Sequence, residues 1–263
     1  MDQDADRRRQ ASSFGGAAAA YAEHRPDYAL EAVRWALAGA PGDRVLDLGA
    51  GTGKLTAGLL VTGARASAVE PDAAMLAELR RSLPGVPALL GSAEAIPVAD
   101  GEIDAVVSGN ALHWFDMERA GPEIARVLAD DGTLAGLWNV VDDGVDWVAG
   151  LTEVAGPEAI GPRDTPSAWL DATADLLRGD PVARFGEPEH ATFAHGQRRT
   201  ADSLVETLAT RAGVLTMPAE QRHARLGRIR DYLASRAETA RGEFVLPMMT
   251  CVLRARLLSP RPA

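Results

Sequence analysis

The sequence predicts an α/β protein with a doubly wound, Rossmann-like sheet that is mostly parallel. Three observations support this prediction. The apolar run Arg44–Leu48 leads through a glycine-rich turn into the helical spacing of Leu55, Leu59 and Leu60. Strand and helix patterns then alternate as far as residue 139. A second long strand-like run, 244–254, follows two helix-like segments near the end of the chain.

The elements are expected in the following order. A helix over 27–38 precedes the strand at 44–48, because Pro26 stops an alanine-rich segment. Further strands are expected at 66–69, 88–90, 104–109 and 133–139, with a helix at 116–128 and a turn at 130–132. From Val140 to Gly186 the alternation is lost. We interpret this segment as an insertion that packs over the strand ends and forms one wall of the substrate pocket, and core packing is the safer interpretation of its tryptophans. An edge strand at 189–193 and helices at 201–212 and 218–235 complete the order.

Composition limits the classes of function. With 263 residues, 46% apolar and 24% charged, the chain fits one soluble α/β domain with a large core. The net charge of −10 argues against nucleic-acid partners and favours a small-molecule substrate. The single Cys251 has no metal-ligand neighbours, so no metal site is expected and a reducing compartment is favoured. Because no signal-peptide core or 18-residue apolar run is present, we expect a cytoplasmic protein without membrane contact.

The glycine-rich turn indicates a ligand-binding loop. A phosphate loop is excluded by spacing, because Leu48 lies five residues before Gly53 and Leu55 follows Lys54. A dinucleotide site would need a third glycine where Lys54 stands, so a nicotinamide-dependent oxidoreductase is the runner-up. The alternative to a ligand-binding loop is an ordinary βα turn that binds no ligand. Glu70 ends the second strand, 17 residues beyond Gly53, where a carboxylate can bind both ribose hydroxyls of a nucleoside.

The pattern Asp-x-Gly-x-Gly-x-Gly at 47–53 resembles the first motif of class I S-adenosylmethionine-dependent methyltransferases. Further resemblances are the segment 14–28, the loop 91–97 (similar to G-D-A-E-x-L-P, with Ser92 in place of Asp) and the run 113–116, which resembles the trans-aconitate methyltransferase-like group. This resemblance implies an antiparallel last strand, a helical cap and S-adenosylmethionine as cofactor. The cofactor-binding residues it implies are Tyr21, Arg25, Asp47, Gly49, Ala50, Gly51, Gly53, Glu70, Pro71, Met75, Ser92, Ala93, Glu94 and Asn110.

The resemblance also implies methyl transfer to an O, N or C nucleophile of a small molecule, such as a metabolite or natural-product intermediate. The expected substrate-binding residues are His24, His113, Trp114, Trp138 and Asn139. His113 is the candidate general base or substrate-orienting residue, although packing under the next helix explains it about equally well. An acidic substrate would need a cation, for which Arg25 and Arg211 are candidates.

Three regions follow from this interpretation: an N-terminal lid and helix (1–40), a cofactor-binding core (41–140) and a substrate-side region (141–263) within one compact domain. A protein of this fold that binds S-adenosylmethionine but guides another reaction, such as a cyclisation, is the alternative. The sequence indicates neither the acceptor nor the oligomeric state.

Overall fold

The computed structural model describes residues 26–173, 175–177 and 184–258. The predicted lid residues Tyr21, His24 and Arg25 lie outside the described residues. Within the described ranges, no helix is both long enough and apolar enough to cross a membrane.

A seven-stranded sheet forms the centre of the molecule, in the order β3-β2-β1-β4-β5-β7-β6. The strands β3, β2, β1, β4 and β5 are parallel to their neighbours, whereas β7 is antiparallel to both β5 and β6. Because the order reverses beside β1, the loops after β1 and β4 meet at the switch point, where ligands bind in such sheets. The predicted mostly parallel sheet with an antiparallel last strand is therefore confirmed. The strands are β1 (Arg44–Leu48), β2 (Arg65–Glu70), β3 (Ala88–Leu90), β4 (Ile103–Gly109), β5 (Leu128–Val141), β6 (Glu189–Arg199) and β7 (Phe244–Arg256).

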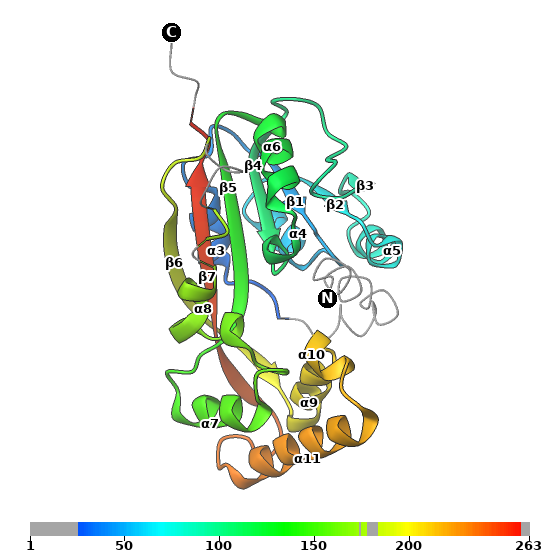
Figure 1. The fold of residues 1–263 in the computed structure, drawn as a ribbon, viewed down its shortest axis with the longest axis vertical. Helices are drawn as coiled ribbons and strands as arrows, with labels where there is room; N and C mark the ends of the chain where they lie inside the picture. The colour runs from blue at the N-terminus through cyan, green and yellow to red at the C-terminus, as the bar shows by residue number, and fades with distance from the viewer. Residues whose placement is uncertain (1–25, 174, 178–183, 259–263) are drawn as a thin grey trace.

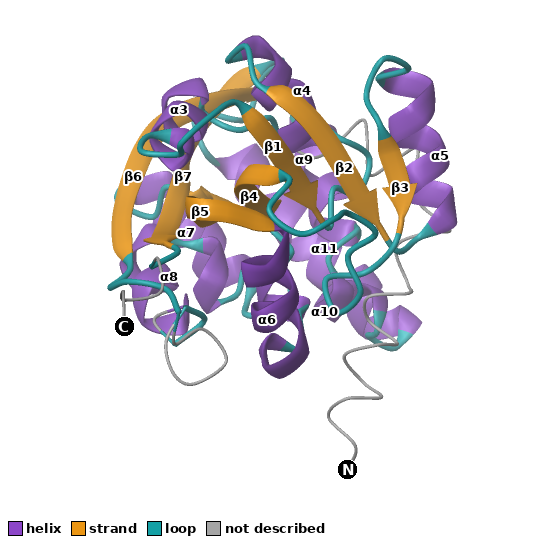
Figure 2. Ribbon diagram, turned by 90° about the horizontal axis from the view of Figure 1, so that it is seen from above, coloured by secondary structure: helices purple, strands orange, loops and turns teal. Residues whose placement is uncertain are grey.

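Helices cover both faces of this sheet. The helices α3 (Leu30–Leu37), α4 (Lys54–Val61) and α5 (Ala73–Ser82) pack on one face, where small residues such as Ala66, Ala68 and Ala105 allow close approach. The helices α6 (Met117–Val127) and α8 (Pro166–Thr173) pack on the other face against Leu46, Val106 and Leu134. Figure 2 shows α3 and α6 on opposite sides of the strands. The central parallel strands β1 and β4 are buried on both faces, as their continuous apolar runs require, whereas the edge strand β3 exposes Leu89 and Leu90.

A second group of helices extends one end of the sheet, and we call it the cap. It comprises α7 (Asp146–Ala155), α9 (Ala201–Ala209), α10 (Ala212–Leu215) and α11 (Ala219–Ser235), together with the segment 156–164 after α7, whose Ala159 and Ile160 pack in the same core. Figure 1 shows β5 and β7 running past the ends of β1 and β2 to reach these helices. Trp147, Leu208 and Ile229 form a core of the cap with the ends of those two strands. The cap therefore rests on the same strands that build the main sheet.

Several element boundaries differ from the sequence-based prediction. The turn expected at 130–132 lies inside β5, with Asp131 at φ 60°. The edge strand β6 extends to Arg199 instead of residue 193, because all eleven of its residues pair with β7. The region 140–186, in which no alternation of strands and helices was expected, contains α7, α8 and the 3₁₀ turn η3 (Pro162–Asp164). The bounds of these elements depend on strand pairing and packing between residues far apart in the chain. The local sequence pattern therefore does not predict them.

A buried polar network ties the start of α3 to the sheet. The Asn139 amide donates to the carbonyls of Pro26 and Asp27, each at 3.1 Å, and its oxygen accepts from the Thr250 hydroxyl at 2.7 Å. The same hydroxyl oxygen accepts from the backbone N–H of Ala29 at 3.0 Å. This network fixes the chain where it enters the fold beside the switch point.

Thr250→Val is expected to lower the free energy of unfolding by about 1–3 kcal/mol, because it removes the hydroxyl and leaves buried partners unpaired. Chemical denaturation measures the change. Thr192→Val on exposed β6 is the matched control, since it removes the same atoms from a solvated side chain and should change stability by less than about 0.5 kcal/mol. Equal effects of the two substitutions would contradict the role given to the network.

Candidate active site

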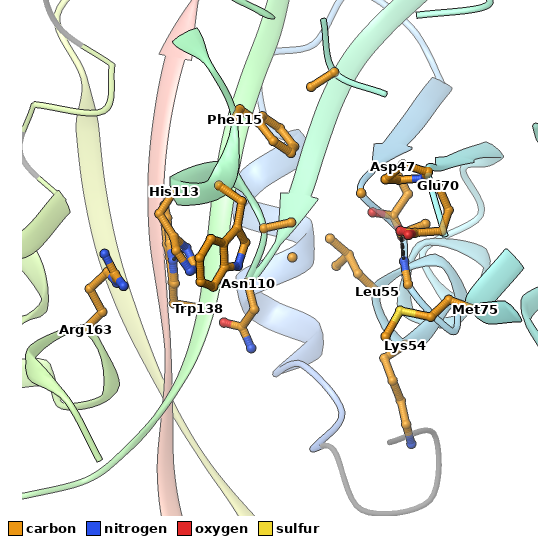
Figure 3. A pocket seen from close by; sticks show the side chains of 18 of the residues that line it. Asp47, Lys54, Leu55, Glu70, Met75, Asn110, His113, Phe115, Trp138 and Arg163 are labelled. Carbon is orange, nitrogen blue, oxygen red and sulfur yellow. Dashed lines mark hydrogen bonds between the residues drawn. The ribbon is translucent and has the colours of Figure 1, made fainter. Parts of the chain in front are cut away.

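A cavity of about 880 Å³ lies between the carboxyl ends of the parallel strands and the cap. Its walls come from the loops after β1, β2 and β4 on one side, and from residues 157–164 and 211–213 on the other. Figure 3 shows Asp47, Glu70 and Met75 on one side of this cavity and His113, Trp138 and Arg163 on the other. The predicted site residues that line it are Asp47, Gly49, Ala50, Gly51, Glu70, Pro71, Met75, Ser92, Ala93, Glu94, Asn110, His113, Trp114 and Trp138.

The glycine turn after β1 adopts a backbone that needs glycine. Gly49, Gly51 and Gly53 have φ of 71°, 56° and 88°, which side chains disfavour. A Cβ on Gly49 would lie 2.9 Å from Ala111 Cβ, so the turn also packs tightly on the loop after β4. Gly53 precedes α4 and does not line the cavity; its Cβ would press on Leu79 of α5 at 3.0 Å. Gly49 and Gly51 thus expose backbone to the cavity, while Gly53 allows helix packing.

Glu70, at the end of β2, holds this turn in place. One carboxylate oxygen accepts from the Gly51 N–H at 2.8 Å and the other from the Asp72 N–H at 2.9 Å. Burial raises the pKa of Glu70, and these two hydrogen bonds partly oppose that effect. Each oxygen keeps a further lone pair, so the carboxylate can also accept from a ligand hydroxyl in the cavity.

Asp47 is fully buried beneath the turn. One of its oxygens accepts from the Thr56 hydroxyl at 2.6 Å, while the other, Oδ1, has no hydrogen-bond partner among the described residues. The pKa of Asp47 is raised to about 7, chiefly by burial; the nearby charge of Glu70 also raises it, and the hydrogen bond from the Thr56 hydroxyl lowers it. A buried acceptor without a donor is costly. Asp47 therefore favours a ligand that brings a donor or a positive charge.

The raised pKa of Asp47 predicts a pH dependence of stability without ligand. Because the folded chain keeps the Asp47 proton up to about pH 7 and the unfolded chain releases it near pH 4, the free energy of unfolding should fall as pH rises between these values. The expected loss from this group is roughly 2–4 kcal/mol. Asp47→Asn keeps the shape and should flatten this decline in denaturation measured from pH 4 to 8. An unchanged decline in the variant would contradict the assignment to Asp47.

On the side of the cavity near β2 and β3, Met75 lies in the first turn of α5, and Ser92, Ala93 and Glu94 follow β3. The Asp72 side chain caps α5 by accepting from the N–H groups of Ala74 and Met75. The Glu94 carboxylate accepts from the Asp116 N–H at 3.1 Å, so Glu94 joins the loops after β3 and β4. These contacts shape a pocket with apolar and polar surfaces beside Glu70.

On the other side, the loop after β4 presents His113 and Trp114 in the 3₁₀ turn η2 (Leu112–Trp114). The indole N–H of Trp138 donates to Nδ1 of His113 at 3.3 Å, and the rings of His113 and Trp114 lie 4.8 Å apart. Trp138 is itself buried against Trp169, with ring centroids 5.6 Å apart. The β5 tryptophan therefore fixes the orientation of the imidazole.

Asn110 occupies the switch point between the two sides. It has φ of 52°, a conformation that asparagine tolerates better than most residues. Its side-chain oxygen accepts from the Asn139 N–H at 3.2 Å. Asn139 does not line the main cavity, because its side chain serves the buried network at Pro26 and Thr250. Its predicted contact with substrate thus finds no support in the cavity lining.

Comparison with known proteins identifies the family. A sequence profile described as "Methyltransferase domain" matches residues 46–136. The uncharacterized methyltransferase Rv3342 of Mycobacterium tuberculosis (strain ATCC 25618 / H37Rv) is 40% identical over 259 residues, which are 95% of this chain and 98% of that protein. This chain belongs to the class I methyltransferases.

More distant relatives agree with the fold of this methyltransferase. The uncharacterized methyltransferase C25B8.09 of Schizosaccharomyces pombe is 31% identical over 216 residues, covering 80% of this chain and 83% of that protein. A solved structure from Anaeromyxobacter dehalogenans, provisionally named a type II methyltransferase, superposes with a TM-score of 0.62 at 24% identity, covering 90% of this chain and 99% of that one. The enzyme class predicted from the glycine motif is confirmed.

Sequence reasoning about this methyltransferase missed most of the cap residues that line the cavity. Glu158, Arg163 and Asp164 stand in the segment 140–186, which was expected to form one wall of the substrate pocket but in which these residues were not named, and Arg211 was named only as a candidate cation. Arg211 pairs with Asp164 at 2.9 Å and Arg225 pairs with Glu158 at 2.9 Å. No local motif marks these residues, because a single arginine or glutamate in an irregular segment is usually solvated. Only the packing of the cap brings them to the cavity.

Proposed function

We propose that this enzyme transfers a methyl group from S-adenosylmethionine to a small-molecule acceptor. The observation that carries the proposal is the pair of buried carboxylates, Asp47 and Glu70, beside a glycine turn that leaves backbone accessible. Asp47 Oδ1, which no described residue pairs, fits an ammonium group, and Glu70 fits ribose hydroxyls. Lys54 stands where a dinucleotide-binding turn has its third glycine, so a nicotinamide dinucleotide fits poorly.

When bound, the cofactor supplies an activated methyl group on a sulfonium, whose positive charge also suits a cavity with an acidic floor. The residues of the chain would position the cofactor and the acceptor and would exclude water from the cavity. Asp47, Glu70 and the glycine turn would hold the nucleoside and amino-acid parts, and Met75 and Ser92–Glu94 would enclose the base. His113 and Trp114 face the remaining space, where the acceptor would lie under the cap.

The acceptor is proposed to be a small molecule because the cap closes over the cavity, and because the chain's charge of −10 disfavours nucleic acid. Membership in the trans-aconitate methyltransferase-like group remains a prediction that rests on the residues 113–116. The division into the regions 1–40, 41–140 and 141–263 also remains a prediction.

Isothermal titration of the purified protein with S-adenosylmethionine, S-adenosylhomocysteine, NADH and ATP tests the proposal. We expect binding of the first two ligands in the micromolar range, weaker binding below pH 7 as Asp47 is protonated, and no binding of NADH or ATP. Asp47→Asn should lose this pH dependence. Binding of NADH in place of the sulfonium nucleoside would overturn the proposed cofactor.

A further inference from the structure

We propose that two copies of this chain pair through the outer edges of their β6 strands, antiparallel and around a two-fold axis at Ala194. The partner is a second copy of the chain, and the proposal does not depend on the reaction proposed above. Three features of β6 carry it: a row of unpaired backbone groups, a long and regular edge, and charges of opposite sign at its two ends.

Hydrogen bonds at both ends of β7 show which of its residues face which neighbour. The N–H of Leu257 donates to the carbonyl of Gly132 at 2.7 Å, and the carbonyl of Pro247 accepts from the N–H of Asp142 at 3.0 Å. Both bonds run to the β5 side of the sheet. Because the N–H and C=O groups of successive residues in a strand point to opposite sides, the odd-numbered residues of β7 face β5 and the even-numbered ones face β6.

The same alternation identifies the residues of β6 that point away from the sheet. Residues that exchange hydrogen bonds in an antiparallel pair lie opposite each other. The even-numbered residues of β7 lie opposite the odd-numbered residues of β6, as Thr250 does opposite Phe193. The even-numbered residues of β6 therefore turn their N–H and C=O groups outward, and within the described ranges these groups have no hydrogen-bond partner. These outward residues are His190, Thr192, Ala194, Gly196 and Arg198.

The edge of β6 lacks the features that usually keep an edge strand from pairing with other chains. Such edges are commonly short, or carry a proline, a lysine or a bulge. β3, at the opposite edge of the sheet, has only three residues. β6 has eleven residues without proline or lysine and keeps one register with β7 throughout. Figure 2 shows it at the outer rim of the sheet, so it offers a long, regular template for another strand.

The charges of β6 favour a second copy as that strand. Glu189 stands at one end, and Arg198 and Arg199 stand at the other. The exposed side-chain fractions of 66% for Glu189 and 83% for Arg198 show that ion pairs within the chain leave both accessible. Two antiparallel copies bring the acidic end of one strand beside the basic end of the other. A parallel pair would place like charges together, which is unfavourable.

Backbone geometry selects the register of this pairing. Outward residues must lie opposite each other for their N–H and C=O groups to bond. The register centred on Ala194 is the one that pairs all of them. It sets Thr192 opposite the partner's Gly196 and His190 opposite the partner's Arg198. A residue on the two-fold axis meets its own copy, and Ala194 is small and uncharged, so it fits that position.

The face of the hairpin beside this edge adds apolar surface. Met249 and Pro247 of β7 lie opposite Ala194 and Gly196, and the outward residues of β6 are all exposed. Val245 is on the same face and is 58% exposed. Its side chain covers Gly196, where a Cβ would lie 2.4 Å from a methyl carbon of Val245. A second copy would remove part of this surface from water, which favours association.

Analytical ultracentrifugation of the full chain, from about 1 to 100 μM, measures the assembly. We expect a monomer–dimer equilibrium with a dissociation constant of about 1–50 μM, because an interface of two edge strands is small. Ala194→Pro should raise this constant about 10-fold or more. It removes an N–H that β7 does not use, and proline is tolerated at such positions of an edge strand.

A charge exchange tests the two-fold axis. Ala194→Lys and Ala194→Glu should each raise the dissociation constant about 10-fold or more, because like charges would face each other at the axis. An equal mixture of the two variants should dimerise again, which a mere disturbance of the fold would not allow. Val61→Lys and Val61→Glu, at an exposed position on α4, are the matched controls and should leave the assembly unchanged. Circular dichroism checks that each variant is folded.

Disulfide cross-linking tests the register. In a hydrogen-bonded antiparallel pair the Cα atoms lie about 5.5 Å apart, which a disulfide can span. Ala194→Cys should therefore form a covalent dimer with oxidised glutathione as the oxidant. His190→Cys should not link to its own copy, but it should link to Arg198→Cys in a mixture of the two variants. The native Cys251 is buried, so the unchanged chain is the control.

Dimerisation that Ala194→Lys and Ala194→Glu abolish separately and restore together supports the proposal. A chain that stays monomeric over the whole concentration range overturns it, and the edge would then be open to a strand of another protein. It is equally overturned if a dimer forms that the Ala194 variants do not weaken, if the mixture of folded Lys and Glu variants stays monomeric, or if His190→Cys links to its own copy as readily as Ala194→Cys.

Discussion

Glu70→Ala is expected to weaken S-adenosylmethionine binding by about 10- to 150-fold, or 1.5–3 kcal/mol. The carboxylate has two tasks in the structure. It accepts from the N–H groups of Gly51 and Asp72, which shapes the glycine turn, and it faces the cavity where ribose hydroxyls would lie. Alanine removes both, and two backbone donors in a half-buried loop lose their partner. Isothermal titration measures the loss of affinity.

Two comparisons separate these tasks. Glu70→Gln keeps the size of the side chain, but its amide NH₂ cannot accept from an N–H group, so it should bind with intermediate or poor affinity. Glu31→Ala, at an exposed position on α3 that does not line the cavity, removes the same charge and should leave the affinity unchanged. Unaltered affinity in Glu70→Ala would remove Glu70 from the cofactor site.

Trp169→Ala is expected to cost about 3–5 kcal/mol of the free energy of unfolding and to reduce turnover as well. Trp169 is buried between α8 and the sheet, and its ring packs on Trp138 at 5.6 Å. The cavity left by alanine would let Trp138 move, and Trp138 is the side chain that orients His113. Trp169→Phe should cost much less, because the indole N–H has no partner in the described structure.

Trp147→Ala provides the matched control. Trp147 is also buried, but it packs on Phe244 inside the cap core, with ring centroids 5.7 Å apart, and it does not line the cavity. We expect a comparable loss in denaturation experiments, without the loss of turnover per folded molecule at temperatures below both melting points. Equal turnover in Trp169→Ala and Trp147→Ala would show that Trp169 acts on stability alone.

The parallel core could be predicted because its information is local. Each strand from β1 to β5 contains a short apolar run, and the positive φ values of Gly49, Gly51 and Gly53 follow from a turn that other residues disfavour. Asp47 and Glu70 could also be identified from the local sequence, because each stands at or next to the end of a predicted strand. The cofactor side of the cavity therefore follows largely from the order of residues along the chain.

The acceptor side could not be predicted in this way. Arg163 is exposed and stands in a 3₁₀ turn of three residues, so nothing in its local sequence distinguishes it from a solvated arginine. The length of β6 depends on its pairing with β7, and its half-exposed alternation is weak evidence alone. Asn139, which was expected to bind substrate, follows Trp138 on β5, and adjacent residues of a strand point to opposite faces. Its side chain lies in the buried network, so its contact with substrate stays a prediction.

One feature of the topology bears on how such enzymes diversify. Arg199 at the end of β6 pairs with Phe244 at the start of β7. The segment from Thr200 to Glu243 is therefore an insertion that connects the two strands of one hairpin. This insertion contains α9, α10 and α11 and contributes Arg211 and Gly213 to the cavity wall. An exchange of this segment between relatives would leave every strand register intact. New acceptors could thus be acquired by replacing one interchangeable module, while the machinery for the methyl donor is inherited unchanged.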